Sequence, residues 1–351
     1  MIRNILLVGA VLGGLVLLLL LGSCKGSGAT FIQASGRPGE VMLVMESEDL
    51  YGKVGHQIVD MLEADAPALP QQEQSFSIGG LVPASSFKGA LQYFRNIITV
   101  VIDESRFTTT SLHYSYDEWA RGQMVLRLQG TSVDSVHTYI GRNREAIMNM
   151  LTRHELYRFG SILEKEYSQM ASEYVDSLFA HRINVPRDIR NHKFAKDFLW
   201  MSNAQMRRRH DLLVYRFPYT SSMDIGLDRL VEARDSVLKA NIQGEFDGTY
   251  PSTVRTGLVY RKVINQGQTR GELRGLWQME GGAMMGGPFV CHAYVDAEKK
   301  YVYVVEGFVY HPNENKLNLI RMMEASLYSF RPRGTSFEAR QILGAGYTKS
   351  F

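Results

Sequence analysis

Apolar and polar residues alternate along this chain with two different periods, and each change of period marks an expected element. In the first half, short runs at residues 41–45, 96–102 and 123–128 predict strands, and the run at 96–102 is rich in β-branched residues. Residues 51–62 place apolar side chains three and four apart, which predicts a helix. Residues 136–154 do the same, and that helical pattern continues with interruptions to about residue 179.

The second half shows a similar order of elements. In chain order we expect a strand at 211–217, a helix at 227–238, strands at 253–263, 272–279, 289–295 and 301–310, and a helix at 317–330. The last two strands are apolar on both faces and are joined by the polar turn 296–300, which predicts a hairpin in the centre of a sheet. We therefore expect an α+β fold with mixed, mainly antiparallel sheets, packed helices and two modules.

Composition divides the chain into five parts. Residues 1–23 are expected to be a signal peptide, 24–39 a lipidated cysteine with a flexible tether, 40–190 and 191–332 two α+β modules, and 333–351 a loose polar tail. Both modules run strand, helix, several antiparallel strands and helix. No residue-level repeat accompanies that likeness, so a duplication rests on element order alone.

The first 24 residues have the order of a bacterial secretory signal. Arg3 supplies a positive charge, residues 4–23 carry none, and small residues precede Cys24. Leu21-Gly22-Ser23-Cys24 resembles a lipobox, in which the cysteine thiol is lipidated and becomes the new N-terminus. We therefore expect the chain to be held on a membrane through Cys24.

An uncleaved transmembrane helix is the alternative reading of this segment. The apolar run is long enough, because about 20 residues cross a bilayer core, whereas a signal core usually has about 7–15. The cysteine in its lipobox setting decides for the lipoprotein. The tether at residues 25–30 lacks an acidic run, which favours the periplasmic face of the outer membrane.

Charge and cysteine usage narrow the class of protein further. The 45% hydrophobic and 21% charged residues are typical of a globular protein. A formal net charge of +3 argues for no nucleic-acid partner. Cys291 is the one other cysteine, so with Cys24 lipidated it has no disulfide partner and the fold depends on its core.

Gly281, Gly282, Gly286 and Gly287 surround two methionines just before an expected buried strand. Glycines let a backbone approach a ligand closely, so these four are binding-loop candidates. A purely structural loop is the favoured alternative. The segment is not a phosphate-binding motif, since it leads into a strand and has no following Gly-Lys-Ser/Thr.

His292 and Glu306 are the best candidates for an acid–base pair. Numbering across a five-residue turn places both on one face of the hairpin, at diagonal positions about 7–8 Å apart or less. A carboxylate there would orient a histidine for proton transfer. A buried, mutually satisfied pair explains the pattern as well and is favoured. Cys291 faces the other way and is expected to be a core thiol.

Other recognisable chemistry is missing from the sequence. The remaining histidines have no metal-ligand spacing, and neither a Cys-x-x-Cys, a His-Glu-x-x-His nor a Gly-x-Ser-x-Gly motif occurs, so no metal and no cofactor is expected. Aromatic residues are plentiful. If several face outward in one cleft, they would form a surface that binds a glycan or a protein.

The chain resembles an uncharacterised family of Bacteroidetes-type envelope lipoproteins that contain a domain of unknown function. The segments that carry the resemblance are 36–40, 95–97, 186–200, 210–215, 217–219, 233–236, 274–277, 285–289, 306–308 and Pro312. The resemblance implies a lipid-anchored envelope protein and gives no catalytic residue. We therefore expect a non-enzymatic binding or assembly module for a protein partner or a glycan. The alternative is an envelope hydrolase that uses His292 and Glu306 near the 281–288 loop.

Overall fold

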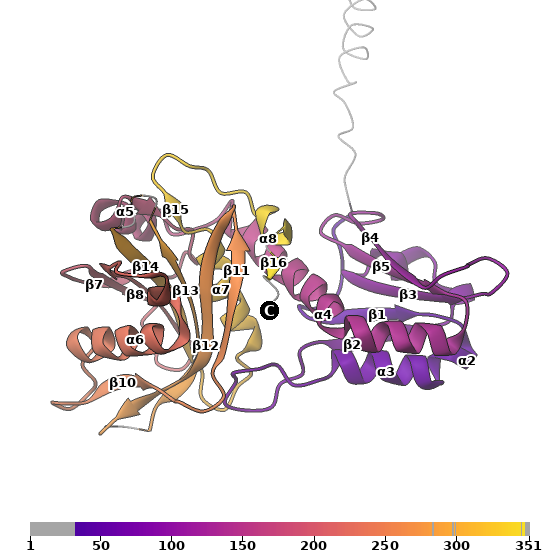
Figure 1. Ribbon diagram of the computed structural model, residues 1–351, viewed down its shortest axis with the longest axis horizontal. Coiled ribbons are helices and arrows are strands. Elements are labelled where there is room, and N and C mark those ends of the chain that lie inside the picture. The colour runs from indigo at the N-terminus through magenta and orange to yellow at the C-terminus, as the bar shows by residue number, and fades with distance from the viewer. Residues whose placement is uncertain (1–31, 283, 297, 299, 345, 348–351) are drawn as a thin grey trace, which may run out of the picture.

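The structure is a computed structural model, and it describes residues 32–282, 284–296, 298, 300–344 and 346–347. Figure 1 shows them as two α+β bodies joined by the long helix α4 (Val133–Leu163). The expected signal peptide and Cys24 lie outside the described residues. Within the described ranges, no helix has both the length and the apolar character that crossing a membrane requires.

The N-terminal body is a five-stranded sheet in the order β2-β1-β3-β5-β4. Its elements are β1 (Glu40–Val44), α2 (Ser47–Leu50), α3 (Lys53–Leu62), β2 (Ser77–Val82), η1 (Ala84–Ser86), η2 (Gly89–Tyr93), β3 (Asn96–Ile102), β4 (Ser111–Tyr116), β5 (Met124–Gly130) and α4. β1 pairs in parallel with β2 and β3, β3 pairs in parallel with β5, and β4 is antiparallel to β5. We expected antiparallel strands in this half. Helix α3 returns the chain between β1 and β2, and such a crossover makes neighbouring strands parallel.

The two faces of this sheet are covered differently. Val41 and Leu43 of β1 point to the face that α3 and α4 cover, where they join a large apolar core. Met42 and Val44 point to the other face and pack with Phe94 and the neighbouring loops. The alternation follows from the two-residue period of a strand.

Helix α4 links the two bodies. Ser132 caps its first turn, where Ser135 N donates to the Ser132 hydroxyl at 3.2 Å. The first half of the helix packs on the N-terminal sheet through residues such as Ile140 and Ile147. The second half buries Leu156 against α7 (Leu317–Tyr328) and the C-terminal segment.

The C-terminal body is built on a curled antiparallel sheet in the order β16-β11-β12-β13-β14-β9-β8-β7, to which β10 adds beside β12. Its elements are α5 (Gln169–Phe179), β6 (His181–Arg182), β7 (Asn191–Ala195), β8 (Phe198–Ser202), β9 (Arg209–Pro218), η3 (Ser222–Ile225), α6 (Leu227–Asn241), β10 (Tyr250–Thr253), β11 (Val259–Asn265), β12 (Gln268–Glu280), β13 (Gly286–Val295), β14 (Tyr301–Tyr310), α7, β15 (Arg331–Pro332), α8 (Gln341–Gly344) and β16 (Gly346–Tyr347). The expected α+β class with mainly antiparallel sheets is confirmed.

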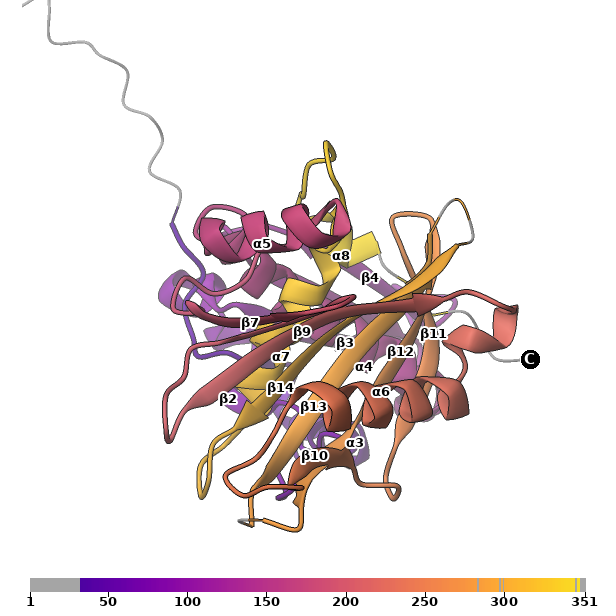
Figure 2. The same ribbon diagram turned by 90° about the vertical axis from the view of Figure 1, so that its left-hand side faces the viewer.

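Helices cover both faces of this large sheet, as Figure 2 shows for α6 on one side and α7 on the other. Val290 and Tyr294 of β13 join the core under α5 and α7. Phe289, Cys291 and Ala293 join the core under α6. Burial on both sides explains why the sequences of β13 and β14 are apolar at almost every position.

Two segments at the edges of the expected modules pack into the C-terminal body. Ala171, Val175 and Phe179 share the core under α7, although the first module was expected to run to residue 190. The expectation of a loose tail from residue 333 is wrong for its described part. Phe337 and Ile342 are buried against α4, and apolar positions this sparse leave no periodic pattern in a sequence.

Candidate functional site

His292 and Glu306 do not share a face of the sheet, so both the candidate acid–base pair and the favoured buried, mutually satisfied pair are wrong. The β13–β14 ladder places His292 opposite Val305 and Glu306 opposite Cys291. The backbone N–H of Asp296 donates to the Tyr301 carbonyl at 3.0 Å, so four residues, not five, separate the closing pair of the turn. A change of one residue in register moves a side chain to the opposite face.

Glu306 points to the α6 face and forms a buried ion pair with Arg234. Nε of Arg234 lies 3.0 and 2.9 Å from the two carboxylate oxygens, and Nη2 lies 2.8 Å from Oε1. The guanidinium also stacks on the Phe289 ring, 3.8 Å from its centroid. Because both charges are fully buried and paired, this contact fixes α6 to the sheet and offers no group to a substrate.

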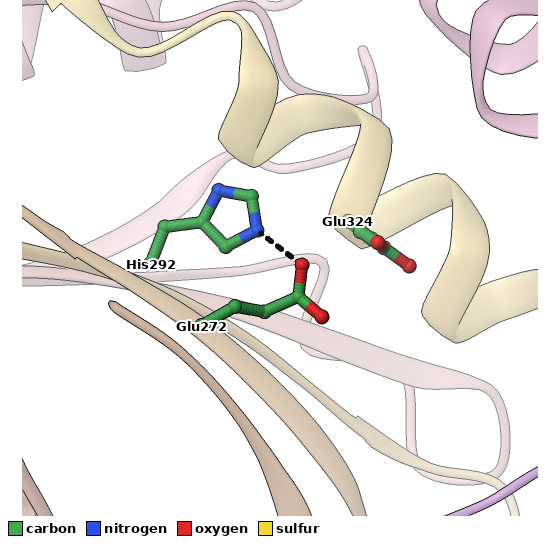
Figure 3. Close-up of side chains that lie close together, drawn as sticks. All are labelled: Glu272, His292 and Glu324. Carbon is green, nitrogen blue, oxygen red and sulfur yellow. Dashed lines mark ion pairs between the residues drawn. The ribbon is translucent and has the colours of Figure 1, made fainter. Parts of the chain in front are cut away.

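His292 points to the α7 face, where it meets two buried carboxylates (Figure 3). Its Nε2 lies 3.5 Å from Oε2 of Glu272, the neighbour on β12. Glu324 of α7 approaches from the facing helix, and one donor atom from each of the three residues lies within 4.8 Å of the others. We call Glu272, His292 and Glu324 the buried triad.

Arginines hold the outer oxygens of the buried triad. Nε of Arg274 and Nε of Arg261 donate to Oε1 of Glu272 at 2.8 and 2.7 Å, and Nη2 of Arg274 donates to Oε1 of Glu324. Burial alone would raise the pKa of Glu272, but these two guanidinium groups outweigh it and hold that pKa well below its usual range. Burial lowers the pKa of His292. The triad thus combines a charged carboxylate with a neutral imidazole.

A cavity of about 230 Å³ lies beside the buried triad, between the two bodies. Its walls include Met148 of α4, Ile320 of α7 and the polar side chains of Arg274 and Glu324. The triad is therefore buried but lies next to a route from the surface.

The second candidate site is a pocket at the other end of the sheet, which we call the aromatic pocket. Its volume is about 260 Å³. The aromatic side chains that line it are Trp200, Trp277, Phe308 and Tyr310. The rings of Trp277 and Phe308 meet edge to face, with centroids 5.5 Å apart, and Nε1 of Trp277 donates to the Val309 carbonyl at 3.1 Å. These contacts fix the ring positions before any ligand arrives.

One charged pair accompanies the aromatic walls. Asp211 accepts hydrogen bonds from Trp200 Nε1 at 2.9 Å and from Arg209 Nε at 3.0 and 2.9 Å. Burial raises the pKa of the Asp211 carboxyl group, and Arg209 and Trp200 act against that rise. The Arg209 guanidinium lies over the Trp200 ring, 5.2 Å from its centroid. The pocket thus joins apolar rings to a carboxylate and a guanidinium.

The glycine-rich loop borders this aromatic pocket through Met285. Three of the four glycines have a backbone reason to be glycine. Gly281 has a φ of +69°, and a Cβ on Gly287 would lie 2.0 Å from the Val309 carbonyl oxygen. A Cβ on Gly286 would lie 2.6 Å from the Trp277 carbonyl oxygen, whereas Gly282 has 3.3 Å to Thr249. The structural explanation holds for three of the four candidates, and contact with a ligand stays a prediction.

Several residues that the sequence made prominent are buried in the core, whereas most residues of these two sites have no signal in the sequence. Cys291 is buried under α6, as expected of a core thiol, and burial raises its pKa. Tyr215 and Tyr303, two of the plentiful aromatics, are buried. Trp200 and Trp277 come from strands that are distant in sequence, so no local motif could have brought them together.

A further cavity, with a volume of about 690 Å³, lies between the C-terminal half of α4 and the first described residues. Its rim alternates basic and acidic side chains, among them Arg121, Arg158, Glu164 and Glu338. This mixture of charges favours no single class of ligand, so the aromatic pocket is the better candidate.

Comparisons with known proteins agree with a chain of two consecutive units. No curated protein matches it. Residues 34–164 match the model of one domain of unknown function, DUF8532, and residues 168–329 match that of another, DUF4837. The junction between these two matches, at residues 165–167, falls between α4 and α5, upstream of the division that the sequence predicts near residue 190.

Proposed function

We propose that this chain is a lipid-anchored protein of a bacterial cell envelope that binds a glycan in the aromatic pocket. Its anchor is lipid on Cys24, and its place is the periplasmic face of the outer membrane. The lipobox-like segment and the resemblance to Bacteroidetes-type envelope lipoproteins support the anchor. The aromatic pocket supports the ligand.

The anchor and the folded part are close in sequence. Seven residues lie between Cys24 and Ile32, the first described residue, so eight Cα–Cα steps join the two. Even a fully extended chain of that length reaches at most about 29 Å. The folded body would therefore stay next to the membrane surface, where envelope glycans are plentiful.

The observation that carries the proposal is the combination of side chains in the aromatic pocket. A sugar ring has an apolar C–H face, which packs on an aromatic ring, and an edge of hydroxyl groups. Trp200, Trp277 and Tyr310 supply rings, while Arg209, held in place by the buried Asp211 carboxylate, supplies charged donors. Charge-assisted hydrogen bonds to hydroxyl groups are about twice as strong as neutral ones, so Arg209 would fix the orientation of the sugar.

The depth of the pocket favours a glycan over a flat protein surface. A volume of about 260 Å³ admits one sugar ring or one side chain. Trp277 and Phe308 are only 4% and 5% exposed, so they lie too deep for a flat protein surface to reach.

A hydrolase built on His292 and Glu306 has no support, since the two side chains lie buried on opposite faces of the sheet.

The test is a direct binding measurement on the full chain in detergent micelles. Envelope oligosaccharides are screened on an array, and hits are measured by calorimetry for the wild type, for Trp200→Ala and for the control Tyr114→Ala. Tyr114 is 58% exposed on the N-terminal body, away from the pocket. We expect Trp200→Ala to bind at least about tenfold more weakly, equivalent to ~1.4 kcal/mol, and Tyr114→Ala to bind like the wild type.

Two results would contradict the proposal. One is a wild-type chain that binds no oligosaccharide on the array. The other is equal binding by Trp200→Ala and the wild type, which would place the glycan elsewhere. Crosslinking of a protein partner at Met285, on the rim of the aromatic pocket, would point to a protein ligand instead.

A further inference from the structure

The buried triad has the composition of a transition-metal site. An imidazole nitrogen and two carboxylate oxygens are a donor set that suits Zn²⁺ and its neighbours in the first transition row. In Glu272, His292 and Glu324, one such atom from each residue lies within 4.8 Å of the others. Donor atoms around a tetrahedral Zn²⁺ lie about 3.3 Å apart, given metal–ligand distances near 2.0–2.1 Å. Nε2 of His292 and Oε2 of Glu272 are already 3.5 Å apart.

The triad also contains buried polar atoms that the described part of the chain leaves without hydrogen bonds. Both ring nitrogens of His292 are of this kind, and so is Oε2 of Glu324. His292 is 0% exposed and Glu324 is 1% exposed. A buried polar atom without a partner costs about 1–3 kcal/mol, and more for a charged group. A cation coordinated at the centre of the triad would satisfy Nε2 and Oε2 together.

The arginines leave the inner oxygens of both carboxylates available. Arg261 and Arg274 occupy Oε1 of Glu272, and Arg274 also occupies Oε1 of Glu324. Oε2 of Glu272 faces His292, with the Tyr328 hydroxyl 3.5 Å away. Outer partners that hold the ligands in this way are a regular feature of metal sites, because they fix the orientation of each ligand.

We propose that Glu272, His292 and Glu324 bind one Zn²⁺ ion, which fastens α7 to strands β12 and β13. The two guanidinium groups repel a cation, so the site needs a metal that gains strongly from a nitrogen ligand. Mg²⁺ and Ca²⁺ prefer all-oxygen sites and would not bind here. The cavity beside Glu324 and Arg274 supplies the entry path. The site lies on the opposite face of the sheet from the α6 helix, and its existence does not depend on glycan binding.

The role of such a metal would be structural. β12, β13 and α7 each supply one ligand, so the ion would cross-link the sheet to the helix that contacts α4. A ligand that binds only the folded state shifts the unfolding equilibrium in proportion to its concentration. At a free metal concentration 100 times the dissociation constant, the shift is about 100-fold.

The test uses the full chain in detergent micelles after treatment with a chelator. ZnCl₂, MgCl₂ or CoCl₂ is added, and bound metal per chain, thermal unfolding and the visible spectrum of Co²⁺ are measured. The variants are His292→Gln and Glu324→Gln. The control is Glu306→Gln, which also changes a buried carboxylate paired with an arginine but lies on the other face of the sheet.

We expect one Zn²⁺ per wild-type chain, a rise in the midpoint of thermal unfolding with ZnCl₂ and none with MgCl₂. Both triad variants should lose the ion and the rise, while Glu306→Gln keeps them. The proposal is overturned if the wild type takes up no stoichiometric Zn²⁺, or if the triad variants bind it as the wild type does. If a variant fails to fold, the Co²⁺ spectrum of the wild type decides. Absorption bands of a tetrahedral site with a nitrogen ligand support the triad, and a spectrum of hydrated Co²⁺ refutes it.

Discussion

Glu306 lies directly opposite Cys291 in the β13–β14 ladder, one position out of step with His292. Glu306 therefore faces α6 and finds Arg234, while His292 faces α7 and finds Glu272. Buried ion pairs thus attach two helices to the sheet, α6 through Arg234 and Glu306 and α7 through Arg274 and Glu324. The two attachments have different compositions and lead to different predictions.

Replacing Arg234 with methionine should destabilise the protein strongly. The substitution keeps an apolar side chain of similar length but leaves Glu306 charged, fully buried and without its ion-pair partner. Breaking a buried pair from one side costs about 3–5 kcal/mol. Urea unfolding would measure that loss as a lower midpoint at an unchanged slope.

A double variant provides the control for this prediction. In Arg234→Met with Glu306→Met, no buried charge remains, and much of the lost free energy of unfolding should return. If the single variant unfolds at the same urea concentration as the wild type, the pair does not hold α6 as we describe.

The sequence predicts the elements of this fold well but predicts their register poorly. The strands predicted at 96–102 and 301–310 have the same bounds in the structure, because each depends on local periodicity. The helix predicted from residue 136 begins three residues earlier, at Val133, and ends at Leu163. The face of His292 depends on whether Asp296 belongs to the turn or pairs with Tyr301. It pairs with Tyr301 in the structure, and the pattern of apolar residues fits either choice.

The candidate sites show the same limit over longer distances. Trp200, Trp277 and Tyr310 belong to β8, β12 and β14, three strands of one sheet that are far apart in sequence. Their convergence depends on strand order, which alternation does not encode. Glu272 and Glu324 are ordinary charged residues in the sequence, and only their burial between a strand and a helix makes them unusual.

Gly287→Ala should destabilise the protein and disturb the aromatic pocket. A Cβ at this position would lie 2.0 Å from the backbone oxygen of Val309, the same atom that accepts the hydrogen bond of Trp277. Backbone must move to relieve such a contact, and overpacking of this kind costs about 1–3 kcal/mol or more. The midpoint of thermal unfolding and the affinity for the glycan should both fall.

Gly282→Ala is the matched control within the same loop. Its Cβ would lie 3.3 Å from the Thr249 side chain, which can shift by a few tenths of an ångström. We expect a change in the free energy of unfolding below about 0.5 kcal/mol, as at most surface positions. Equal losses in the two variants would mean that the whole loop needs glycine for another reason, such as a ligand.

Cys24→Ala should stop lipid attachment. The proposed modification needs the cysteine thiol, and alanine keeps the small size of the neighbouring residues without it. Metabolic labelling with a fatty-acid analogue should mark the wild type and leave the variant unlabelled, and the variant should retain its signal segment. A variant that is still cleaved and anchored would identify the segment as an ordinary signal or a membrane helix.

The stability of the protein should fall between pH 7.5 and pH 5.0, in part because of His154. This residue is fully buried in α4, with Nδ1 2.7 Å from Oδ1 of Asn96. Burial, with the nearby charges of Arg158 and Arg95, holds the pKa of His154 well below its usual range. Below the unfolded pKa of about 6.5, the unfolded chain therefore binds a proton that the folded chain does not.

Each such histidine lowers the free energy of unfolding by up to about 1.4 kcal/mol per pH unit below pH 6.5. His154→Gln removes this titration and leaves the other buried histidines in place. The variant should start less stable at pH 7.5 but lose about 2 kcal/mol less than the wild type on acidification to pH 5.0. Urea unfolding at several pH values measures both slopes. Parallel slopes would show that His154 binds its proton equally in the folded and unfolded chains, and that its burial is less complete than the structure shows.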